Sequence, residues 1–470
     1  PLRSSQVGQF RGVEAQQSAS EAPHTSGTMS VRKGLLTTVI GSYPKPCYCK
    51  NLIPDWFAAS KKAYDESCGD QGVVTDLFNA KAKSVSAMDR EKALLRATKQ
   101  VLDEQADFGI DVPTDGEVRR ENYIHHLCRS IEGISFENLT RTKCRPRKDE
   151  STGETVYAYE ARLPTVVGPV RWRCHEGGSD VSIPRDDDEG QGRVAASAAP
   201  AVGGGDNGSG YPPSVVVEEW KLAQAQSPDG RAVKYTLPGP MTIIGTVANQ
   251  HYVAANGFSE EQLARDLAVL IKGCVDALAK AGCRQIQIDE PLFARRPDEA
   301  IQWGIGTLDS IVADVPAGVM TTCHICCGYP QYLDHDDYVK ADNDAYIRLA
   351  PHLAKTSLSA ISLEDAHRPN DLSKLLPALG DKTIVLGSVK IASSKVETVE
   401  AIEERLRQAL EYMPADRLMV APDCGLGYLT PELVEKKLRN MVEAAQRVGC
   451  QLKRSVADES PPEKRLRFPA

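Results

Sequence analysis

The sequence of 470 residues lacks any stretch that approaches about 18 uninterrupted apolar residues, so no membrane-spanning helix is expected. It also lacks an excess of positive charge, because it has 56 Lys and Arg residues but 64 Asp and Glu residues, and its isoelectric point is near 5.7. A broad surface for nucleic acid is therefore not expected. The sequence contains 41% hydrophobic and 26% charged residues, which is typical of a globular chain.

Cysteine is too scarce for a disulfide framework, since 13 residues, an odd number, are spread over a long chain. Their positions are more informative. Cys323, Cys326 and Cys327 surround His324, and Cys424 lies in a Pro-Asp-Cys-Gly turn. In a reducing compartment such a cluster favours a metal site over disulfides. No apolar segment supports secretion, so we expect a cytoplasmic protein.

Three segments are too polar or too simple in composition to supply a core. Residues 1–30 are rich in Ser, Gln, Ala and Gly, and we expect them to be disordered. Residues 175–213 combine acidic, Ala-rich and Gly-rich runs, which predicts a flexible surface insertion. Residues 451–470 read as a disordered charged tail, whose basic clusters are either simply solvated or a nuclear-import signal. The remaining residues, 31–450, form the predicted domain.

Within this domain, short apolar or β-branched runs alternate with amphipathic helical patterns. The eight predicted strands are residues 35–41, 110–114, 232–237, 284–289, 317–323, 357–363, 383–388 and 417–421. The predicted helices are residues 88–108, 260–281, 297–314, 341–354, 371–379, 396–412 and 431–448. Repeated βα units predict an α/β fold of the (β/α)8 TIM barrel type, with a doubly wound sheet as the alternative.

One long excursion separates the second and third predicted strands. Residues 153–173 alternate and contain Gly168-Pro169, which predicts a hairpin that turns there. Residues 214–226 then read as a strand that leads into a helix. We expect the excursion to form an inserted subdomain beside the barrel.

Chemically notable residues follow most of the predicted strands. The C-terminal strand ends of a (β/α)8 barrel meet at one mouth, where its active site lies, so these residues are expected to converge. They are Gly41-Ser42-Tyr43-Pro44, Thr114-Asp115-Gly116-Glu117, Leu237-Pro238-Gly239-Pro240, Asp289-Glu290-Pro291, His324-Ile325-Cys326, Glu364-Asp365 and Asp423-Cys424-Gly425.

Four of these residues form a coherent ligand set. His324 and Cys326, two residues apart in an extended segment, can hold one ion together, while Cys424 offers a thiolate and Glu364 a carboxylate. Such a set suits tetrahedral Zn²⁺, and one weak ligand is typical of a catalytic rather than a structural site. The simpler alternative is that the cysteines are small buried apolar residues.

Other polar residues have alternatives too. Asp115, Glu117 and Asp289 could be turn or capping residues, but their apolar strand context favours substrate binding. His125 and His126 follow a charged run, and we expect them on the surface of a helix rather than at a metal.

With these motifs in place, the chain resembles the cobalamin-independent methionine synthase family, in its C-terminal catalytic barrel. Seven motifs, in family order from about residue 34 to 450, carry the resemblance. They are Ile40-Gly41-Ser42-Tyr43-Pro44, Asp115-Gly116-Glu117, Gly239-Pro240-Met241-Thr242, Gln287-Ile288-Asp289-Glu290-Pro291, His324-Ile325-Cys326, Ile361-Ser362-Leu363-Glu364 and Pro422-Asp423-Cys424-Gly425-Leu426.

The resemblance implies a function and the residues that carry it. It implies a zinc enzyme that moves a methyl group to the thiol of homocysteine and forms methionine. The implied zinc ligands are His324, Cys326, Glu364 and Cys424. The implied substrate residues are Ile40 and Ser42 for the amino-acid carboxylate and Glu117 and Asp289 for the ammonium group.

Two departures from the long-form enzymes concern the methyl donor. The chain leaves no room for the second, N-terminal barrel that helps to hold folate, and only about 30 residues precede the first strand. Ala392 stands where the long forms have a histidine thought to protonate the leaving folate, and no tryptophan follows Gly239-Pro240. The chain therefore looks like the short single-barrel relatives. The expected donor is 5-methyltetrahydrofolate or a methylated corrinoid, the latter on a corrinoid protein partner.

In the expected mechanism, Glu364 yields its place at zinc to the homocysteine sulfur, and Asp115 or a water protonates the leaving group. Two alternatives remain open. The first is a zinc-dependent alkyltransferase that acts on another thiol, and the second is a non-catalytic zinc-binding barrel.

Overall fold

The computed structural model describes residues 34–49, 52, 86–148, 155–173, 212–328, 332–334 and 340–459. Residues 1–30 and most of the predicted insertion at 175–213 lie outside this part of the chain, as do residues 460–470. Among the described residues, no helix combines the length and apolar character that a membrane span requires.

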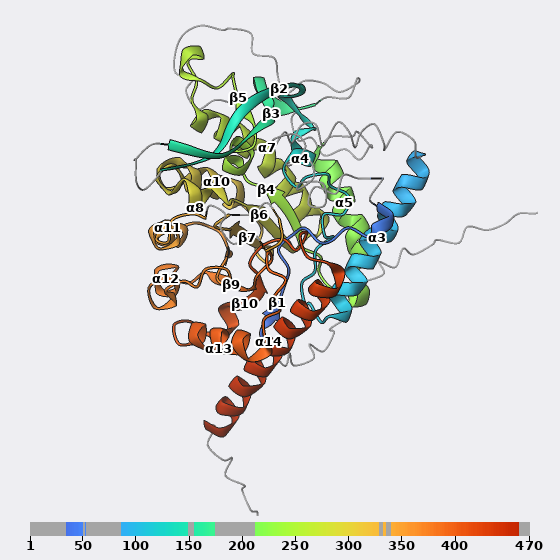
Figure 1. Ribbon diagram of the computed structural model, residues 1–470, viewed down its shortest axis with the longest axis vertical. Helices are drawn as coiled ribbons and strands as arrows, with labels where there is room; N and C mark the ends of the chain where they lie inside the picture. The colour runs from blue at the N-terminus through green and yellow to red at the C-terminus, as the bar shows by residue number, and fades with distance from the viewer. Residues whose placement is uncertain are drawn as a thin grey trace, which may run out of the picture. The chain divides into compact units, whose positions relative to one another are not determined.

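Seven parallel strands form the main sheet (Figure 1). They are β1 (Leu36–Thr37), β4 (Tyr235–Pro238), β6 (Gln285–Asp289), β7 (Met320–Ile325), β8 (Ala360–Leu363), β9 (Thr383–Val389) and β10 (Leu418–Pro422). Their spatial order is β1-β10-β9-β8-β7-β6-β4, so each strand from β6 onward pairs with its predecessor in the sheet. These strands are almost wholly buried, as expected for a parallel sheet covered by helices.

The second predicted strand closes this sheet into a barrel. It is reduced to two parallel bridges, Thr38 with Val112 on the β1 side and Thr114 with Lys234 on the β4 side. Because both edges of the sheet pair with one segment, the strands form a ring, as the (β/α)8 prediction requires. The doubly wound alternative is therefore excluded.

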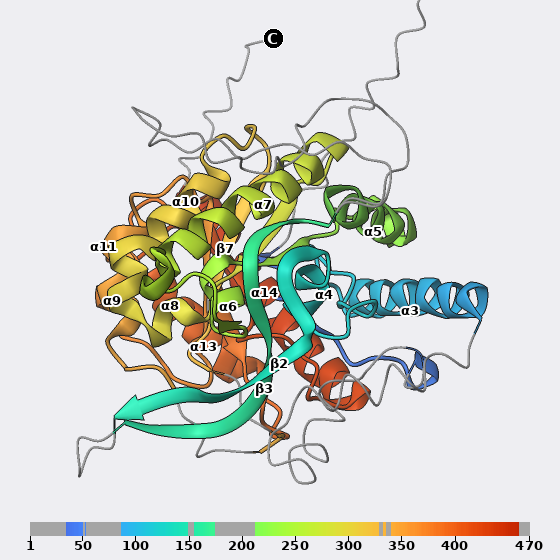
Figure 2. The same cartoon turned by 90° about the horizontal axis from the view of Figure 1, so that it is seen from above.

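Helices surround the strands (Figures 1 and 2). They are α3 (Ala87–Asp107), α4 (His125–Cys128), α5 (Pro212–Gln226), α6 (Pro240–Ile244), α7 (Glu260–Ala281), α8 (Leu292–Arg295), α9 (Pro297–Glu299), α10 (Ile305–Val312), α11 (Ala345–Leu353), α12 (Leu372–Ala378), α13 (Val399–Leu410) and α14 (Pro431–Glu459). Sequence signals set several of their ends. The side chain of Ser259, for example, accepts a hydrogen bond from the backbone N–H of Gln262 and caps α7.

Three helical segments differ from the sequence predictions. The helix predicted at 297–314 is interrupted by a π-helix at Ala300–Gly304. Residues 214–226 contain no strand, because two prolines begin α5 and the valines that follow continue it as a helix. Helix α14 runs on to Glu459, so residues 451–459 of the predicted disordered tail are helical.

A second sheet contains the long antiparallel hairpin of β2 (Ile131–Lys148) and β3 (Thr155–Trp172), with β5 (Ala248–Asn249) beside β3. The hairpin runs outward from the barrel as a ribbon (Figure 2). The predicted turn at Gly168-Pro169 is wrong. These residues lie inside β3 at a shift of register opposite Gly133, where an added Cβ would lie 2.4 Å from the carbonyl oxygen of Pro169. The Gly-Pro pair, which the sequence analysis interpreted as a turn, therefore belongs to a β-bulge.

Helix α14 packs against the start of β1 through two glycines. A Cβ at Gly449 would lie 2.2 Å from Cα of Gly34, so Gly449→Val is expected to lower the free energy of unfolding by about 2 kcal/mol or more. Urea denaturation measures this change. Gly306→Ala in α10 is the control, because its Cβ would enter open space and the substitution should stabilise the helix by up to about 1 kcal/mol. Equal effects of the two substitutions would contradict the close packing.

Candidate metal and substrate site

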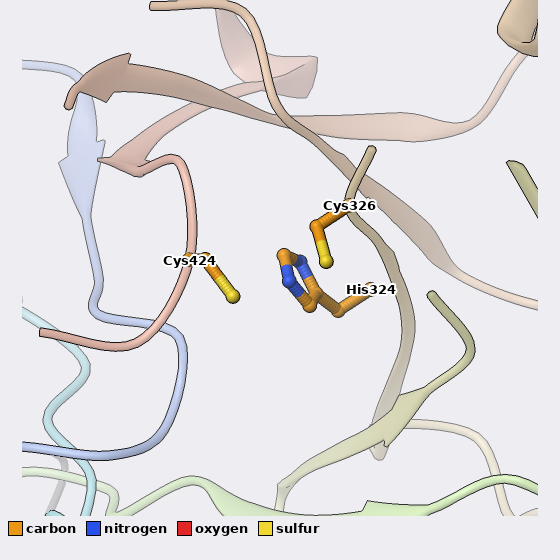
Figure 3. Close-up of side chains that lie close together, drawn as sticks. All are labelled: His324, Cys326 and Cys424. Carbon is orange, nitrogen blue, oxygen red and sulfur yellow. The ribbon is translucent and has the colours of Figure 1, made fainter. Parts of the chain in front are cut away.

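The ends of β7 and β10 bring a histidine and two cysteines together. His324 lies in β7, Cys326 follows that strand, and Cys424 follows β10. One ring nitrogen and the two sulfur atoms all lie within 4.8 Å of one another. Figure 3 shows the three side chains around a common centre. This group could hold a metal ion, and its members come from strand ends far apart in the sequence.

The hydrogen bonds of the imidazole leave one nitrogen available to a ligand. His324 Nδ1 lies 2.9 Å from Oγ of Ser362, whereas the buried Nε2 has no hydrogen-bond partner among the described residues. Histidine ligands are commonly oriented in this way through the second nitrogen. A buried nitrogen without a partner, next to two sulfur atoms, fits a soft or borderline cation such as Zn²⁺.

Glu364 lies beside this group but not within it. Its Oε2 accepts a hydrogen bond of 2.9 Å from the backbone N–H of Cys327, and its buried Oε1 has no partner in the described part of the chain. Burial raises the pKa of Glu364 to about 7, and the nearby Cys326 adds to the effect. The neighbouring Cys424 and His324 hold the pKa of Cys326 well below its usual range. The role of Glu364 as a fourth ligand stays a prediction.

Asp423 fixes the turn that follows Glu364. Its carboxylate accepts hydrogen bonds of 2.9, 2.9 and 2.6 Å from the backbone N–H groups of residues 365–367. Asp365 makes a two-pronged ion pair with Arg405 of α13, at 2.6 and 2.8 Å. The loop after β8 is therefore tied both to the loop after β10 and to an outer helix, which limits its movement near the metal group.

Glu117 lies at the second strand end, in a left-handed turn with φ of 54°. Its Oε1 accepts a hydrogen bond of 2.7 Å from Oγ1 of Thr236 and lies 3.4 Å from Nη1 of Arg120. Gly41 gives this carboxylate room, because a Cβ there would lie 2.8 Å from Oε1. Asp115 supports the turn through a hydrogen bond of 2.9 Å from the N–H of Glu117. Burial raises the pKa of Glu117.

Asp289 and the backbone at Ile40 share one hydrogen-bond donor. The amide of Gln287 donates to Oδ1 of Asp289 at 2.7 Å and to the carbonyl oxygen of Ile40 at 2.9 Å. Burial raises the pKa of Asp289 to about 6. Ser42 packs closely on the loop after β10, since a Cβ at Gly425 would lie 2.1 Å from its Oγ. The predicted substrate residues thus adjoin the predicted metal loops, and their roles remain predictions.

Three residues of this region are not among the sequence candidates. Tyr123 has a pKa well above its usual range because of burial, and the charges of Asp289 and Cys326 add to it. Lys234 and Gln287 are buried polar residues behind the substrate side of the site. A signal for these two exists in the sequence, since both interrupt apolar strand runs, whereas Tyr123 lies in a loop without periodicity.

The predicted surface position of the histidine pair is wrong for one of its members. His125 is buried, its ring packs edge-on against Phe136, and burial lowers its pKa. His126 remains partly exposed and pairs with Glu219 at 2.8 Å. Neither histidine belongs to the metal group, as the sequence predicted.

The loop after β9 places Ala392 next to a histidine from the neighbouring loop. The backbone N–H groups of Ile391 and Ala392 donate to Nε2 of His367 at 3.0 and 3.2 Å. Burial lowers the pKa of His367 to about 3, so its ring is neutral and serves as an acceptor. This imidazole supports the loop and does not replace the proton donor that the resemblance leads one to expect at position 392.

Comparisons with known proteins find relatives that match this chain along most of its length. Residues 197–447 match a family model described as the catalytic domain of cobalamin-independent synthase. A methionine synthase of Saccharolobus solfataricus is 27% identical over 89% of this chain and 96% of that protein, and one of Sulfolobus acidocaldarius is 26% identical over 89% and 94%.

Solved structures give the same result. A B12-independent methionine synthase from a Shewanella species, in complex with selenomethionine, has a TM-score of 0.65 and 25% identity, over 90% of this chain and 99% of that one. A putative vitamin-B12-independent methionine synthase of Listeria monocytogenes, at 18% identity and a TM-score of 0.53, shares the fold over 88% of this chain and 98% of its own.

Removal of the hydroxyl that orients His324 should weaken metal binding without abolishing it. We expect Ser362→Ala to lower the affinity for Zn²⁺ by about tenfold, measured by competition with a chromophoric chelator. Ser388→Ala is the matched control. That serine is also buried in the sheet, but its hydroxyl bonds to the carbonyl oxygen of Ala421. Equal losses for both variants would show that the bond to Ser362 does not orient a ligand.

Proposed function

Because this chain belongs to the cobalamin-independent methionine synthase family, we propose that it is a zinc-dependent methyltransferase that methylates the thiol of homocysteine and forms methionine. The observation that carries the proposal is the group of His324, Cys326 and Cys424 at the barrel mouth. Buried Asp289 lies at the end of β6, next to β7, and buried Glu117 follows the segment that bridges β1 and β4. The cytoplasm suits this chemistry, because thiols stay reduced there.

His324, Cys326 and Cys424 would hold Zn²⁺, with Glu364 as the fourth ligand. The donor set supports this assignment, since it combines a thiol of low pKa with an imidazole nitrogen and a carboxylate oxygen that have no hydrogen-bond partner among the described residues. When bound, Zn²⁺ lowers the pKa of a coordinated thiol, so that the sulfur can react as a thiolate near neutral pH.

The chain's own residues would orient the amino-acid part of homocysteine. Glu117 and Asp289 present carboxylates to the ammonium group, and the backbone at Ile40 and Ser42 receives the carboxylate. Fixing both ends of a small substrate places its sulfur in one position, which is the main contribution of such a site to a methyl transfer. Charged hydrogen bonds are strong in this buried setting, because water competes little for them.

The donor side is less similar to the long-form enzymes. His367 serves as a neutral acceptor for the loop that contains Ala392, so the described residues place no histidine in the role of the acid. Asp115 is our candidate for the proton source, because its buried Oδ2 has no hydrogen-bond partner among the described residues. The donor is 5-methyltetrahydrofolate or a methylated corrinoid, which would be carried by a corrinoid protein.

Cys326→Ser should remove both zinc and activity. A serine hydroxyl is not deprotonated as a thiol is, so the variant loses a charged ligand. We expect stoichiometric zinc in the unchanged protein, less than about a tenth of it in the variant, and no detectable methylation of homocysteine. Metal analysis and X-ray absorption, which counts sulfur ligands, measure the first effect. Cys274→Ala, in helix α7 away from the mouth, should keep zinc. Normal methylation by Cys326→Ser would exclude the proposal.

Glu364→Gln tests the fourth ligand. The amide keeps the shape and the bond to the N–H of Cys327 but removes the charge, so we expect zinc affinity to fall, yet less than in Cys326→Ser. Chelator competition and the number of oxygen neighbours in the X-ray absorption spectrum measure this change. An unchanged spectrum and affinity would place Glu364 outside the metal site.

One set of assays identifies both the methyl donor and the thiol acceptor. Zinc-loaded protein is supplied with methylcobalamin, or with methyltetrahydrofolate that has one or three glutamates, and with homocysteine or another thiol. Turnover of homocysteine with any of these donors supports the proposal. Preference for a different thiol indicates the alternative alkyltransferase, and zinc binding without turnover of any pair indicates a non-catalytic barrel.

A further inference from the structure

A buried lysine stands behind the proposed amino-acid pocket. Lys234 is 3% exposed and directly precedes β4, where an isolated parallel bridge pairs it with Thr114. Its Nζ donates to the carbonyl oxygen of Val39 at 2.5 Å and to Oε1 of Gln287 at 2.6 Å. No carboxylate lies within ion-pair distance of this amine among the described residues. A buried amine without a carboxylate is costly, which calls for a function.

The amine fixes the orientation of one amide. An amine can only donate when it is protonated, and its bond to Gln287 therefore requires the amide oxygen to face Lys234. The amide nitrogen must then face the other way, where both of its hydrogens are used, toward Asp289 at 2.7 Å and the carbonyl oxygen of Ile40 at 2.9 Å. A reversed amide would set two donors against each other at Lys234 and two acceptors against each other at Asp289.

We propose that Lys234 is a positioning residue for substrate selection. Through Gln287 it holds Asp289 in the arrangement that receives the ammonium group of homocysteine. This inference rests on the proposed function for the identity of the ligand. Lys234 acts through Gln287 and touches neither the substrate nor the metal group.

The chain of contacts is continuous and specific. Gln287 Nε2 binds one oxygen of Asp289, and no described residue donates to the second oxygen, which is left for the ligand. Burial lowers the pKa of Lys234 to about 7, and a neutral amine keeps two N–H groups for its two acceptors. Only the protonated amine, which has no lone pair, excludes the reversed amide by itself. When Lys234 is neutral, the acceptors at Asp289 and Ile40 still require Nε2 of Gln287 to face them.

The test compares two ligands that differ by one group. Homocysteine and 4-mercaptobutanoate share the thiol and the carboxylate, and only homocysteine has the ammonium group. Affinities of both for zinc-loaded protein are measured by calorimetry, and kcat and KM are measured for homocysteine. We expect Lys234→Met to lower the affinity for homocysteine by about tenfold or more. The affinity for 4-mercaptobutanoate should fall by less than about twofold. The loss should appear in KM, with little change in kcat or zinc content.

Two further variants keep the test decisive. Gln287→Leu removes the link itself and should produce the same selective loss, and the double variant should lose no more than either single one, because both act through one contact. Lys437→Met is the matched control, since Lys437 is equally buried but pairs with Glu397. It should lower stability and leave the ratio of the two affinities unchanged.

The outcomes distinguish this inference from the proposed function. If the unchanged protein binds both ligands equally, the assignment of the ammonium pocket fails. Suppose that the unchanged protein prefers homocysteine. The positioning role is overturned if Lys234→Met and Gln287→Leu both keep that preference, or if both variants lose affinity for the two ligands equally.

Discussion

Barrel closure is the constraint on which the rest of the site depends. Strands β7 and β10 are separated by β8 and β9, and three strand spacings in a flat sheet would amount to about 14 Å. The ligand atoms that these strands carry nevertheless lie within 4.8 Å of one another. Only a strongly curved sheet brings such distant strand ends together, and the bridges at Val112 and Thr114 complete that curve.

Closure of the barrel buries carboxyl groups, and nearby hydrogen-bond donors offset the cost of this burial. Glu117, Asp289 and Glu364 are carboxyl groups buried at strand ends of the barrel, where loss of water opposes their ionisation, and the charge of Glu117 adds to this effect at Asp289. Each receives a hydrogen bond from a fixed donor, namely a threonine hydroxyl, a glutamine amide and a backbone N–H. Within the described part of the chain, Nε2 of His324 and Oε1 of Glu364 are buried and have no hydrogen-bond partner. Unsatisfied buried groups are rare in native proteins, and their occurrence together fits a binding site.

The sequence was sufficient for what depends on period and order. Alternation of strands and helices predicted the barrel, and the position of His324, Cys326 and Cys424 after strands predicted their meeting. The sequence was insufficient where one short sequence pattern is compatible with two different structures. Gly168-Pro169 reads as a turn but forms a bulge, because the partner strand decides between the two. Charged residues after Gln451 read as a tail but extend α14, since Leu, Lys, Arg and Glu are good helix formers.

Contacts that join distant strands were beyond the reach of sequence patterns. Lys234 and Gln287 are recognisable as polar residues in apolar runs, yet nothing in either run says that they bond to each other or to Ile40. The residues nearest to the reacting atoms are therefore the more predictable ones, because their chemistry is distinctive. The residues that orient them are of ordinary types. Their role depends on contacts between residues far apart in the sequence, which form only when the strands close into a barrel.

The two halves of the site differ in how completely the described residues account for them. On the proposed acceptor side, the candidate ligand atoms, the buried carboxylates and the groups that donate to them lie at the strand ends of the barrel. On the donor side, the imidazole nearest to Ala392 is used as a neutral acceptor for the backbone of its own loop. A folate amine needs a proton when it leaves, whereas a corrinoid metal leaves with the bonding electrons and needs none. The arrangement around Ala392 thus favours a donor whose leaving group requires no acid, unless Asp115 supplies the proton from the opposite side of the barrel.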